Sequence, residues 1–299
     1  MNQTEEIIIE RVSYSKVAAY IKLTKPRLSL LVVFSAVISY FTIYPKQYDW
    51  QHIMALAVGG FLVTASANAY NQVIEREFDK LMKRTQTRPL PQEILNSTEA
   101  LLFATLCGGF GSWLLFEFTN DICGILSVVS IALYTLIYTP LKRLTPFSVF
   151  VGAIPGALPT LIGALAGEEG FGRISMYPML LYSIQFVWQF PHFWAIAWVS
   201  HDDYQKAGFF MLPSKGGRDM GSRFQLFIYT LFLIPISLSP YLFGFAGLYG
   251  SIVVLLMGIN FLFQAYRLYK DGELASARKL MFGSFYYLPV VQLALMIGY

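Results

Sequence analysis

The chain has 299 residues, of which 56% are hydrophobic and only 13% charged, and its mean hydropathy is +0.52. An average soluble domain is about 25% charged, so this composition excludes a soluble globule and indicates a protein surrounded by lipid. The formal net charge of +4 is spread along the chain and does not indicate nucleic-acid binding. Cys107 and Cys123 lie inside apolar blocks and are expected to be small hydrophobic residues rather than a disulfide or metal site.

The first 24 residues are predicted to form a cytoplasmic segment, and residues 25–299 a single transmembrane domain. The segment contains Glu5, Glu6 and Glu10 and no apolar core, so we expect no cleaved targeting peptide. Apolar blocks of about 20 residues can cross about 30 Å of hydrocarbon as helices. They predict an all-α polytopic membrane bundle of about nine transmembrane helices at residues 27–44, 50–74, 98–118, 122–141, 146–166, 175–199, 224–243, 246–266 and 281–298.

The lysines and arginines predict the orientation of this bundle. With these spans, twenty of the 22 basic residues fall on one side of the membrane, and only Lys46 and Arg173 on the other. Basic residues concentrate in cytoplasmic connections. The N-terminus is therefore predicted to be cytoplasmic and the C-terminus to lie outside.

The end of the second predicted span contains a row of oxygen ligands. Asn71, Glu75 and Asp79 are spaced four residues apart, which spreads them over roughly 80° of a helix and about 12 Å of its axis. Asn68 lies near the same stripe. Such a row suits Mg²⁺, which takes oxygen ligands and shares them with substrate phosphates. The alternative is a solvated helix end with Glu75 and Asp79 in the cytoplasm, and this motif alone does not decide.

Two basic motifs follow at the same membrane face. Arg84 and Arg88 belong to the run Lys83–Pro89, and arginine forks match phosphate geometry. Tyr138 and Lys142 end the fourth span and could also meet a diphosphate. Each motif has a simpler interpretation, since basic residues favour the cytoplasmic side and lysines anchor helices at the interface.

The sixth span ends in a second acidic cluster, Asp202 and Asp203, on the same side as the first. His192 lies inside this span, directly after Pro191. Ionisable groups within a membrane usually have a function, and an imidazole can ligate a haem iron or accept a proton. Alternatively, His192 bonds to carbonyls that Pro191 leaves unpaired. His201 is expected near the surface, where an ordinary surface role is the simpler interpretation.

Together, these motifs predict one site. Two acidic clusters on separate helices, with arginines and lysines between them, would hold Mg²⁺ and a diphosphate. The apolar bundle would accept the attached hydrocarbon chain.

At these residues the chain resembles the UbiA superfamily of intramembrane prenyltransferases, and within it the branch that farnesylates haem. The superfamily's first motif is Asn-Asp-x-x-Asp-x-x-x-Asp followed by Lys-Arg-Thr-x-x-Arg-Pro. It is similar to residues 71–79 and 83–89, with Gln72 and Glu75 in place of two aspartates. The resemblance covers the chain from roughly residue 20 to its end.

The second superfamily motif is reduced here to residues 202–204, and Ser200 stands where members acting on quinones tend to have another aspartate. The stretch 188–213, which includes Pro-His-Phe-Trp at 191–194, is typical of the haem branch.

The resemblance implies a central cavity open toward lipid, in which farnesyl diphosphate and haem B react with Mg²⁺ as cofactor. The product would be haem O, so haem B is a substrate and not a prosthetic group. Asn71, Glu75, Asp202 and Asp203 would position Mg²⁺, with Asp79 also catalytic. The diphosphate would be bound by Asn68, Arg84, Arg88, Tyr138 and Lys142, and haem would be contacted by His192, as ligand or base, and by His201.

Further expectations concern the protein's surroundings. Besides membrane lipid, haem A synthase or oxidase-assembly proteins are conceivable partners. The lack of a transit peptide favours the cytoplasmic membrane of a bacterium.

Two other functions are weighed against this one. A related transferase for a quinone precursor would contain a full Asp-x-x-x-Asp motif and lack Pro-His-Phe-Trp. A secondary transporter would place its ionisable groups near the midplane and contain inverted repeats. Here the charged clusters lie at one face, and the number of spans is odd.

Overall fold

The computed structural model describes residues 12, 14–43, 48–168 and 174–297. Within these ranges the chain is helical and contains no strand, which confirms the predicted all-α class. Half of the predicted N-terminal segment (residues 1–11 and 13), and also Lys46 and Arg173, lie outside the described residues. The elements are α1 (Lys16–Leu23), α2 (Pro26–Thr42), α3 (Trp50–Met54), η1 (Ala55–Gly59), α4 (Gly60–Ile74), α5 (Arg76–Asp79), α6 (Ser97–Phe118), α7 (Asp121–Ala132), η2 (Leu133–Tyr138), α8 (Thr139–Leu141), α9 (Ser148–Gly167), α10 (Met176–Val199), α11 (His201–Lys206), α12 (Met220–Leu242), α13 (Leu248–Asp271) and α14 (Leu274–Leu295), where η denotes a π-helix.

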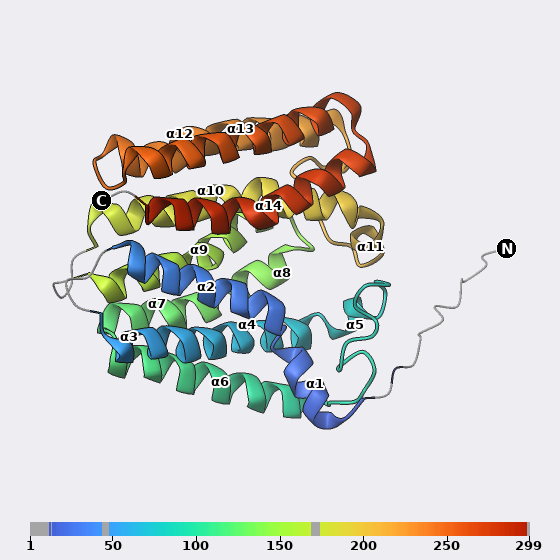
Figure 1. The fold of residues 1–299 in the computed structure, drawn as a ribbon. Helices are drawn as coiled ribbons and strands as arrows, with labels where there is room; N and C mark the ends of the chain where they lie inside the picture. The colour runs from blue at the N-terminus through green and yellow to red at the C-terminus, as the bar shows by residue number, and fades with distance from the viewer. Residues whose placement is uncertain (1–11, 13, 44–47, 169–173, 298–299) are drawn as a thin grey trace.

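The long helices run side by side in one bundle (Figure 1). Six helical stretches in the described part of the chain are long and apolar enough to cross a membrane: Trp50–Ile74, Ser97–Phe118, Asp121–Leu141, Ser148–Gly167, Met220–Leu242 and Leu248–Asp271. Helix α2 is apolar but shorter, and α10 and α14 are long but do not meet the same criteria. The protein is therefore a multi-pass membrane protein, while the number of nine spans and the orientation stay predictions.

The last two helices differ most from the predicted boundaries. Helix α13 extends to Asp271 and stops at Gly272, whose φ of 67° is left-handed and ends the helix. Helix α14 then begins at Leu274, seven residues before the predicted start at 281. Arg278 and Lys279 lower the hydropathy of its first turns, although long basic side chains are tolerated at helix ends.

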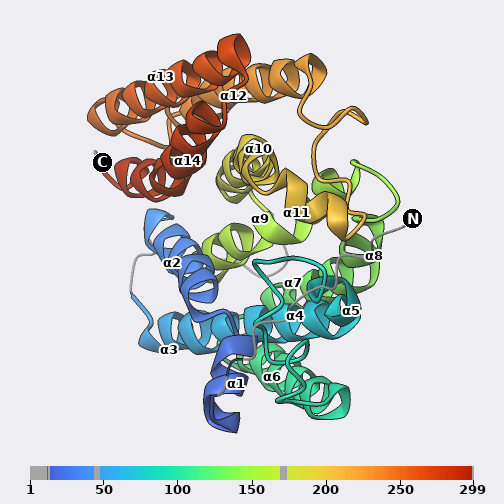
Figure 2. The same cartoon turned by 90° about the vertical axis from the view of Figure 1, so that its right-hand side faces the viewer.

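Contacts between neighbouring helices close the bundle into a ring. Helices α2, α4, α6, α7, α9, α10, α12, α13 and α14 each pack against the next, and α14 packs against α2. Figure 2 shows this arrangement from the end where α5, α8 and α11 lie. Helix α2 also packs on α9, so that α9 contacts α2 as well as α7 and α10.

The outer faces of the helices are apolar, as lipid requires. On α6, Leu102 and Leu106 are 61% and 63% exposed, and on α13 Leu256 is 61% exposed. An exposed apolar surface of this extent is not stable in water. It agrees with the composition of the chain.

Polar side chains from neighbouring helices donate to carbonyls of α9, including one that a proline leaves unpaired. Pro159 removes the hydrogen bond that the carbonyl of Pro155 would accept, and Ser130 Oγ of α7 donates to that carbonyl at 3.4 Å. From α10, Gln189 Nε2 donates to the Ala153 carbonyl at 2.9 Å and Gln185 Nε2 to the Gly156 carbonyl at 2.8 Å. The hydrogen bond from Ser130 is one way in which membrane helices tolerate proline.

Helices α4 and α10 end in the same way. Helix α4 is interrupted at Glu75 (φ −93°, ψ 4°) and continues as α5, and α10 is interrupted at Ser200 (φ −101°, ψ 17°) and continues as α11. Both short extensions lie at the same end of the bundle (Figure 2). The two acidic sequence clusters are therefore carried by two similar helix ends.

Gly163 provides a test of the helix packing. A Cβ at this position would overlap the backbone carbonyl of Ala36 where α2 crosses α9, whereas a Cβ at Gly109 would have no neighbour within 4 Å. We expect Gly163→Ala to lower the Tm of the purified protein in detergent by about 5 °C or more, because backbone atoms cannot move aside easily. Gly109→Ala is the matched control and should leave the Tm unchanged or slightly higher. Equal melting temperatures for both variants would contradict this packing.

Candidate active site

The predicted row of oxygen ligands is buried. Asn71, Glu75 and Asp79 are 2%, 5% and 0% exposed, whereas Arg76 and Glu77 between them are exposed. Backbone hydrogen bonds from Glu75 to Asn71 (2.9 Å) and from Asp79 to Glu75 (2.8 Å) keep the three residues on successive turns despite the interruption at Glu75. The alternative of a solvated helix end is therefore wrong.

The Asn71 amide is held in one orientation. Thr139 Oγ1 donates its proton to the Tyr134 carbonyl at 2.8 Å, so this hydroxyl can only accept from Asn71 Nδ2, which lies 3.2 Å away. The π-helical turn η2 makes the Tyr134 carbonyl accessible to residue 139. Consequently, Asn71 Oδ1 is the outward atom of the amide, and Lys25 Nζ donates to it at 3.5 Å.

Lys25 has a strained backbone. Its φ of 47° is in the left-handed region, which non-glycine residues rarely adopt, and it immediately precedes α2. Burial lowers the pKa of Lys25 to about 7, and the nearby cations Arg88 and Lys142 add to this effect. The predicted site did not include this residue, which begins a Lys-Pro-Arg run at 25–27.

Both carboxylates of the row have a cationic partner. Lys142 Nζ donates to Glu75 Oε1 at 2.7 Å, and Arg88 Nη1 donates to Asp79 Oδ2 at 2.7 Å. Burial raises the pKa of Asp79, and Arg88 opposes that rise. Among the described residues no group donates to Asp79 Oδ1, which is fully buried. A buried carboxylate oxygen without a donor suits a cation or a protonated ligand.

The second acidic cluster meets the first through the connection that follows α5. The Arg84 backbone N–H donates to Asp203 Oδ2 at 3.3 Å, and Arg84 Nη2 donates to the Tyr204 hydroxyl at 3.2 Å. The Phe210 N–H, beyond α11, donates to the Lys142 carbonyl at 2.7 Å. The structure thus brings α4, α5, α8 and α11 together at one end, as the combined motifs predict.

Asp202 points away from this junction. Its side chain is 76% exposed, and Arg218 donates to both of its carboxylate oxygens at 3.2 to 3.3 Å. Arg218 also donates to the Trp198 carbonyl at 2.8 Å, at the end of α10. Asp202 and Asp203, adjacent in sequence, therefore have different surroundings.

Asn68 and His201 lie outside the paired charges of the junction. Asn68 Nδ2 donates to the Thr24 carbonyl and to Ser29 Oγ, both at 3.4 Å, and so ties α4 to the start of α2. His201 packs against the backbone of Gly217. Neither side chain contacts the paired charges of the junction through a hydrogen bond to a described residue.

Tyr138 forms a wall of the junction. Its ring is buried against Gly152 of α9, where a Cβ would overlap it. Lys142 Nζ lies 4.7 Å from the centre of the same ring. A cation over an aromatic face is held without losing its charge.

His192 lies within α10, about 10 Å along the helix axis from Val199 at its end. The residue is buried, and its Nδ1 is 2.7 Å from Ser284 Oγ of α14. The ring stacks on Trp188 with 4.3 Å between centroids. The alternative that His192 bonds to carbonyls left by Pro191 is therefore wrong, because its partner is a hydroxyl on another helix.

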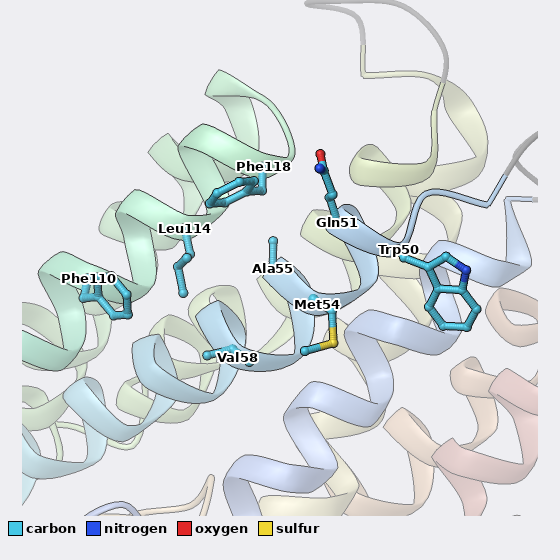
Figure 3. Close-up of a pocket in the computed structure, with 8 residues that line it drawn as sticks. All are labelled: Trp50, Gln51, Met54, Ala55, Val58, Phe110, Leu114 and Phe118. Atoms are coloured by element: carbon cyan, nitrogen blue, oxygen red, sulfur yellow. The ribbon is translucent and has the colours of Figure 1, made fainter.

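An apolar groove lies between α3–η1 and α6, and α3 is at the opposite end of the bundle from α5 (Figure 1). Figure 3 shows Leu114 and Phe118 of α6 facing Ala55 of η1. Its position on the outer surface suits lipid. The predicted central cavity stays a prediction.

The donor set of the junction fits Mg²⁺. Among the described residues no three histidine, cysteine or acidic side chains form a metal-binding group by themselves. The oxygens at hand are Asn71 Oδ1, the Glu75 and Asp203 carboxylates and the unpartnered Asp79 Oδ1. Mg²⁺ commonly combines a few such oxygens with those of substrate phosphates.

Comparison with solved structures shows the fold. The chain superimposes with a TM-score of 0.78 on a digeranylgeranylglyceryl phosphate synthase, at 20% identity, covering 95% of this chain and 98% of the other. A UbiA homologue from Archaeoglobus fulgidus bound to GPP and Mg²⁺ superimposes with a TM-score of 0.69 at 14% identity, covering 93% of this chain and 100% of the other.

Comparison with known sequences shows the family. The chain is 46% identical to the protoheme IX farnesyltransferase of Cytophaga hutchinsonii, covering 94% of this chain and 97% of that protein. It is 43% identical to the protoheme IX farnesyltransferase of Christiangramia forsetii, covering 94% and 93%. The model of the UbiA prenyltransferase family matches residues 32–288. The chain therefore belongs to the UbiA prenyltransferase family.

Proposed function

We propose that this protein transfers the farnesyl group of farnesyl diphosphate to a vinyl group of haem B, giving haem O and diphosphate. The observation that carries this proposal is the junction of α4, α5, α8 and α11. Buried oxygens of Asn71, Glu75 and Asp79 face Lys25, Arg88 and Lys142 there. The names of the relatives support haem as the acceptor.

The diphosphate would bind at the paired charges. Lys142 and Arg88 pair with carboxylates, Lys25 with the Asn71 amide oxygen and Arg84 with the Tyr204 hydroxyl. All four cations can turn to phosphate oxygens, and Tyr138 lines the same space. Asn68 would support this end by holding α4 against α2. Mg²⁺, when bound, supplies positive charge to the leaving diphosphate. Asn71, Glu75 and Asp203 would hold it directly, and the exposed Asp202 through water.

Neutralising the diphosphate allows the allylic C–O bond to break, with the electron pair going to the diphosphate oxygen. The farnesyl carbon then forms a bond with the vinyl group of haem B, and water adds to the resulting cation and releases a proton. The apolar bundle keeps other water away from the farnesyl chain. His192 would contact haem from α10, and His201 is the second proposed haem contact.

The proposal includes the setting of the protein. Residues 25–299 would form the prenyltransferase domain, preceded by a cytoplasmic segment at 1–24. Farnesyl diphosphate would enter from the cytoplasmic face, and haem B from the lipid of a bacterial cytoplasmic membrane. Proteins that consume haem O, such as a haem A synthase, would be partners.

A direct assay tests the function. Membranes containing the protein, incubated with haem B, labelled farnesyl diphosphate and Mg²⁺, should form labelled haem O, and EDTA should abolish this product. Membranes without the protein are the control. Transfer of label to a quinone precursor and not to haem B would contradict the proposed acceptor.

Substitutions at the junction test the site. We expect Asn71→Ala and Asp203→Ala each to lower turnover by about a hundredfold or more, because each removes an oxygen that positions positive charge on the leaving group. Glu77→Gln is the matched control, since Glu77 lies on α5 but is exposed and pairs with Arg76 and Lys80. It should retain normal turnover. Normal activity of either alanine variant would remove that residue from the site.

Thr139 tests the orientation of the Asn71 amide. Thr139→Val keeps the shape but removes the hydroxyl that accepts from Asn71 Nδ2, so the amide can turn its oxygen away. We expect the Mg²⁺ concentration for half-maximal activity to rise about tenfold, as for other groups that orient metal ligands. Thr139→Ser restores the hydroxyl and should restore the Mg²⁺ requirement. An equal Mg²⁺ requirement for valine and serine would contradict this role.

A further inference from the structure

Ser284 Oγ of α14 makes two short hydrogen bonds, one within its own helix and one to His192 of α10. Ser284 Oγ donates to the Met281 carbonyl at 2.6 Å, one turn back on its own helix. The same Oγ lies 2.7 Å from His192 Nδ1. The hydroxyl therefore has contacts with one carbonyl and one ring nitrogen.

These two contacts determine where the imidazole proton is. A hydroxyl has one proton, and a carbonyl can only accept, so the Ser284 proton belongs to the bond with Met281. Ser284 Oγ must then accept from His192, and Nδ1 carries the imidazole proton. In a neutral imidazole the other nitrogen, Nε2, then has a lone pair. Nε2 has no hydrogen-bond partner among the described residues.

The ring is also fixed in its plane. Trp188, one turn earlier on α10, stacks on His192 at 4.3 Å and 19°, and Trp188 Nε1 donates to the Ser284 carbonyl at 3.0 Å. The rings of Phe193 and Phe285 each have their centroid 5.2 Å from that of His192. The surroundings are thus aromatic and apolar, and Phe285 is exposed to the lipid side.

This environment favours a metal over a proton as the partner of Nε2. None of the four residues around the ring carries a charge that would stabilise an imidazolium inside the membrane. A neutral nitrogen ligand among aromatic rings suits a metal ion at the centre of a flat apolar macrocycle.

We propose that Ser284 is a positioning residue, which holds His192 as the Nδ1–H tautomer so that Nε2 can ligate the iron of haem B. This inference rests on the proposed function and assigns His192 the role of axial ligand rather than base. It also places the haem ligand apart from the proposed diphosphate site, since His192 lies about 10 Å along α10 from the end that leads to Asp203.

Optical and electron-paramagnetic-resonance spectra test the ligation without measuring turnover. The purified protein, titrated with haem B, should give the spectrum of histidine-ligated haem. His192→Gly should lose it, and added imidazole should restore it. Ser284→Ala should weaken haem binding about tenfold and mix other ligation states into the spectrum. Ser276→Ala, which removes a hydroxyl of α14 that bonds to Asp271 instead, should match the wild type.

The tautomer of His192 can also be measured by NMR in protein that keeps Ser284. The chain has three histidines, so ¹⁵N-histidine NMR spectra of the haem-free protein can be assigned by replacing His52 and His201. We expect a protonated Nδ1 and an unprotonated Nε2 for His192. This measurement is decisive even if Ser284→Ala does not fold.

Three results would overturn the inference: a protonated Nε2, wild-type ligation in His192→Gly, or no ligation of haem B by the wild type. If haem O nevertheless forms, the proposed function stands without this role of Ser284. If histidine-ligated haem is found and no farnesyl transfer occurs, the proposed function fails and the haem site remains.

Discussion

The ion pairs Glu75–Lys142 and Asp79–Arg88 determine how the helix ends meet. A charge removed from water is costly unless an opposite charge lies next to it, and both carboxylates are nearly inaccessible. The Glu75–Lys142 pair joins residues 67 positions apart in the chain, and the Asp79–Arg88 pair joins α5 to the loop that follows it. The end of α4 therefore cannot move independently of α8 or of that loop. The same requirement makes the junction receptive to a diphosphate, which can replace a carboxylate as partner of a cation.

Two interrupted helices supply the acidic groups for this junction. The backbone breaks at Glu75 and Ser200 separate α5 from α4 and α11 from α10. Arg84 connects them by donating to Asp203 and Tyr204. The haem contact proposed at His192 lies deeper on α10, which places the two substrates of the proposed reaction on one helix and its extension.

Much of this site could be predicted from local spacing. Asn71, Glu75 and Asp79 share a face because a helix repeats every 3.6 residues, and the structure places them on successive turns. The different environments of Asp202 and Asp203 could not be predicted, because the partner of Asp202 is Arg218, beyond a loop. The contact of Thr139 with Asn71 could not be predicted either, since it depends on the π-helical turn η2, which makes the Tyr134 carbonyl accessible to the Thr139 hydroxyl.

The sequence by itself determined the all-helical class, the apolar outer surface and the presence of acidic clusters at helix ends, because hydropathy and helical periodicity are local properties. Its boundaries differed most at the end of α13 and the start of α14, where basic residues such as Lys270 and Arg278 lie in the terminal turns of the helices. Tertiary structure alone decided which partner each polar group has. Lys25 reaches Asn71 and Ser284 reaches His192 across helices, and such contacts follow from how helices pack and not from spacing along one of them.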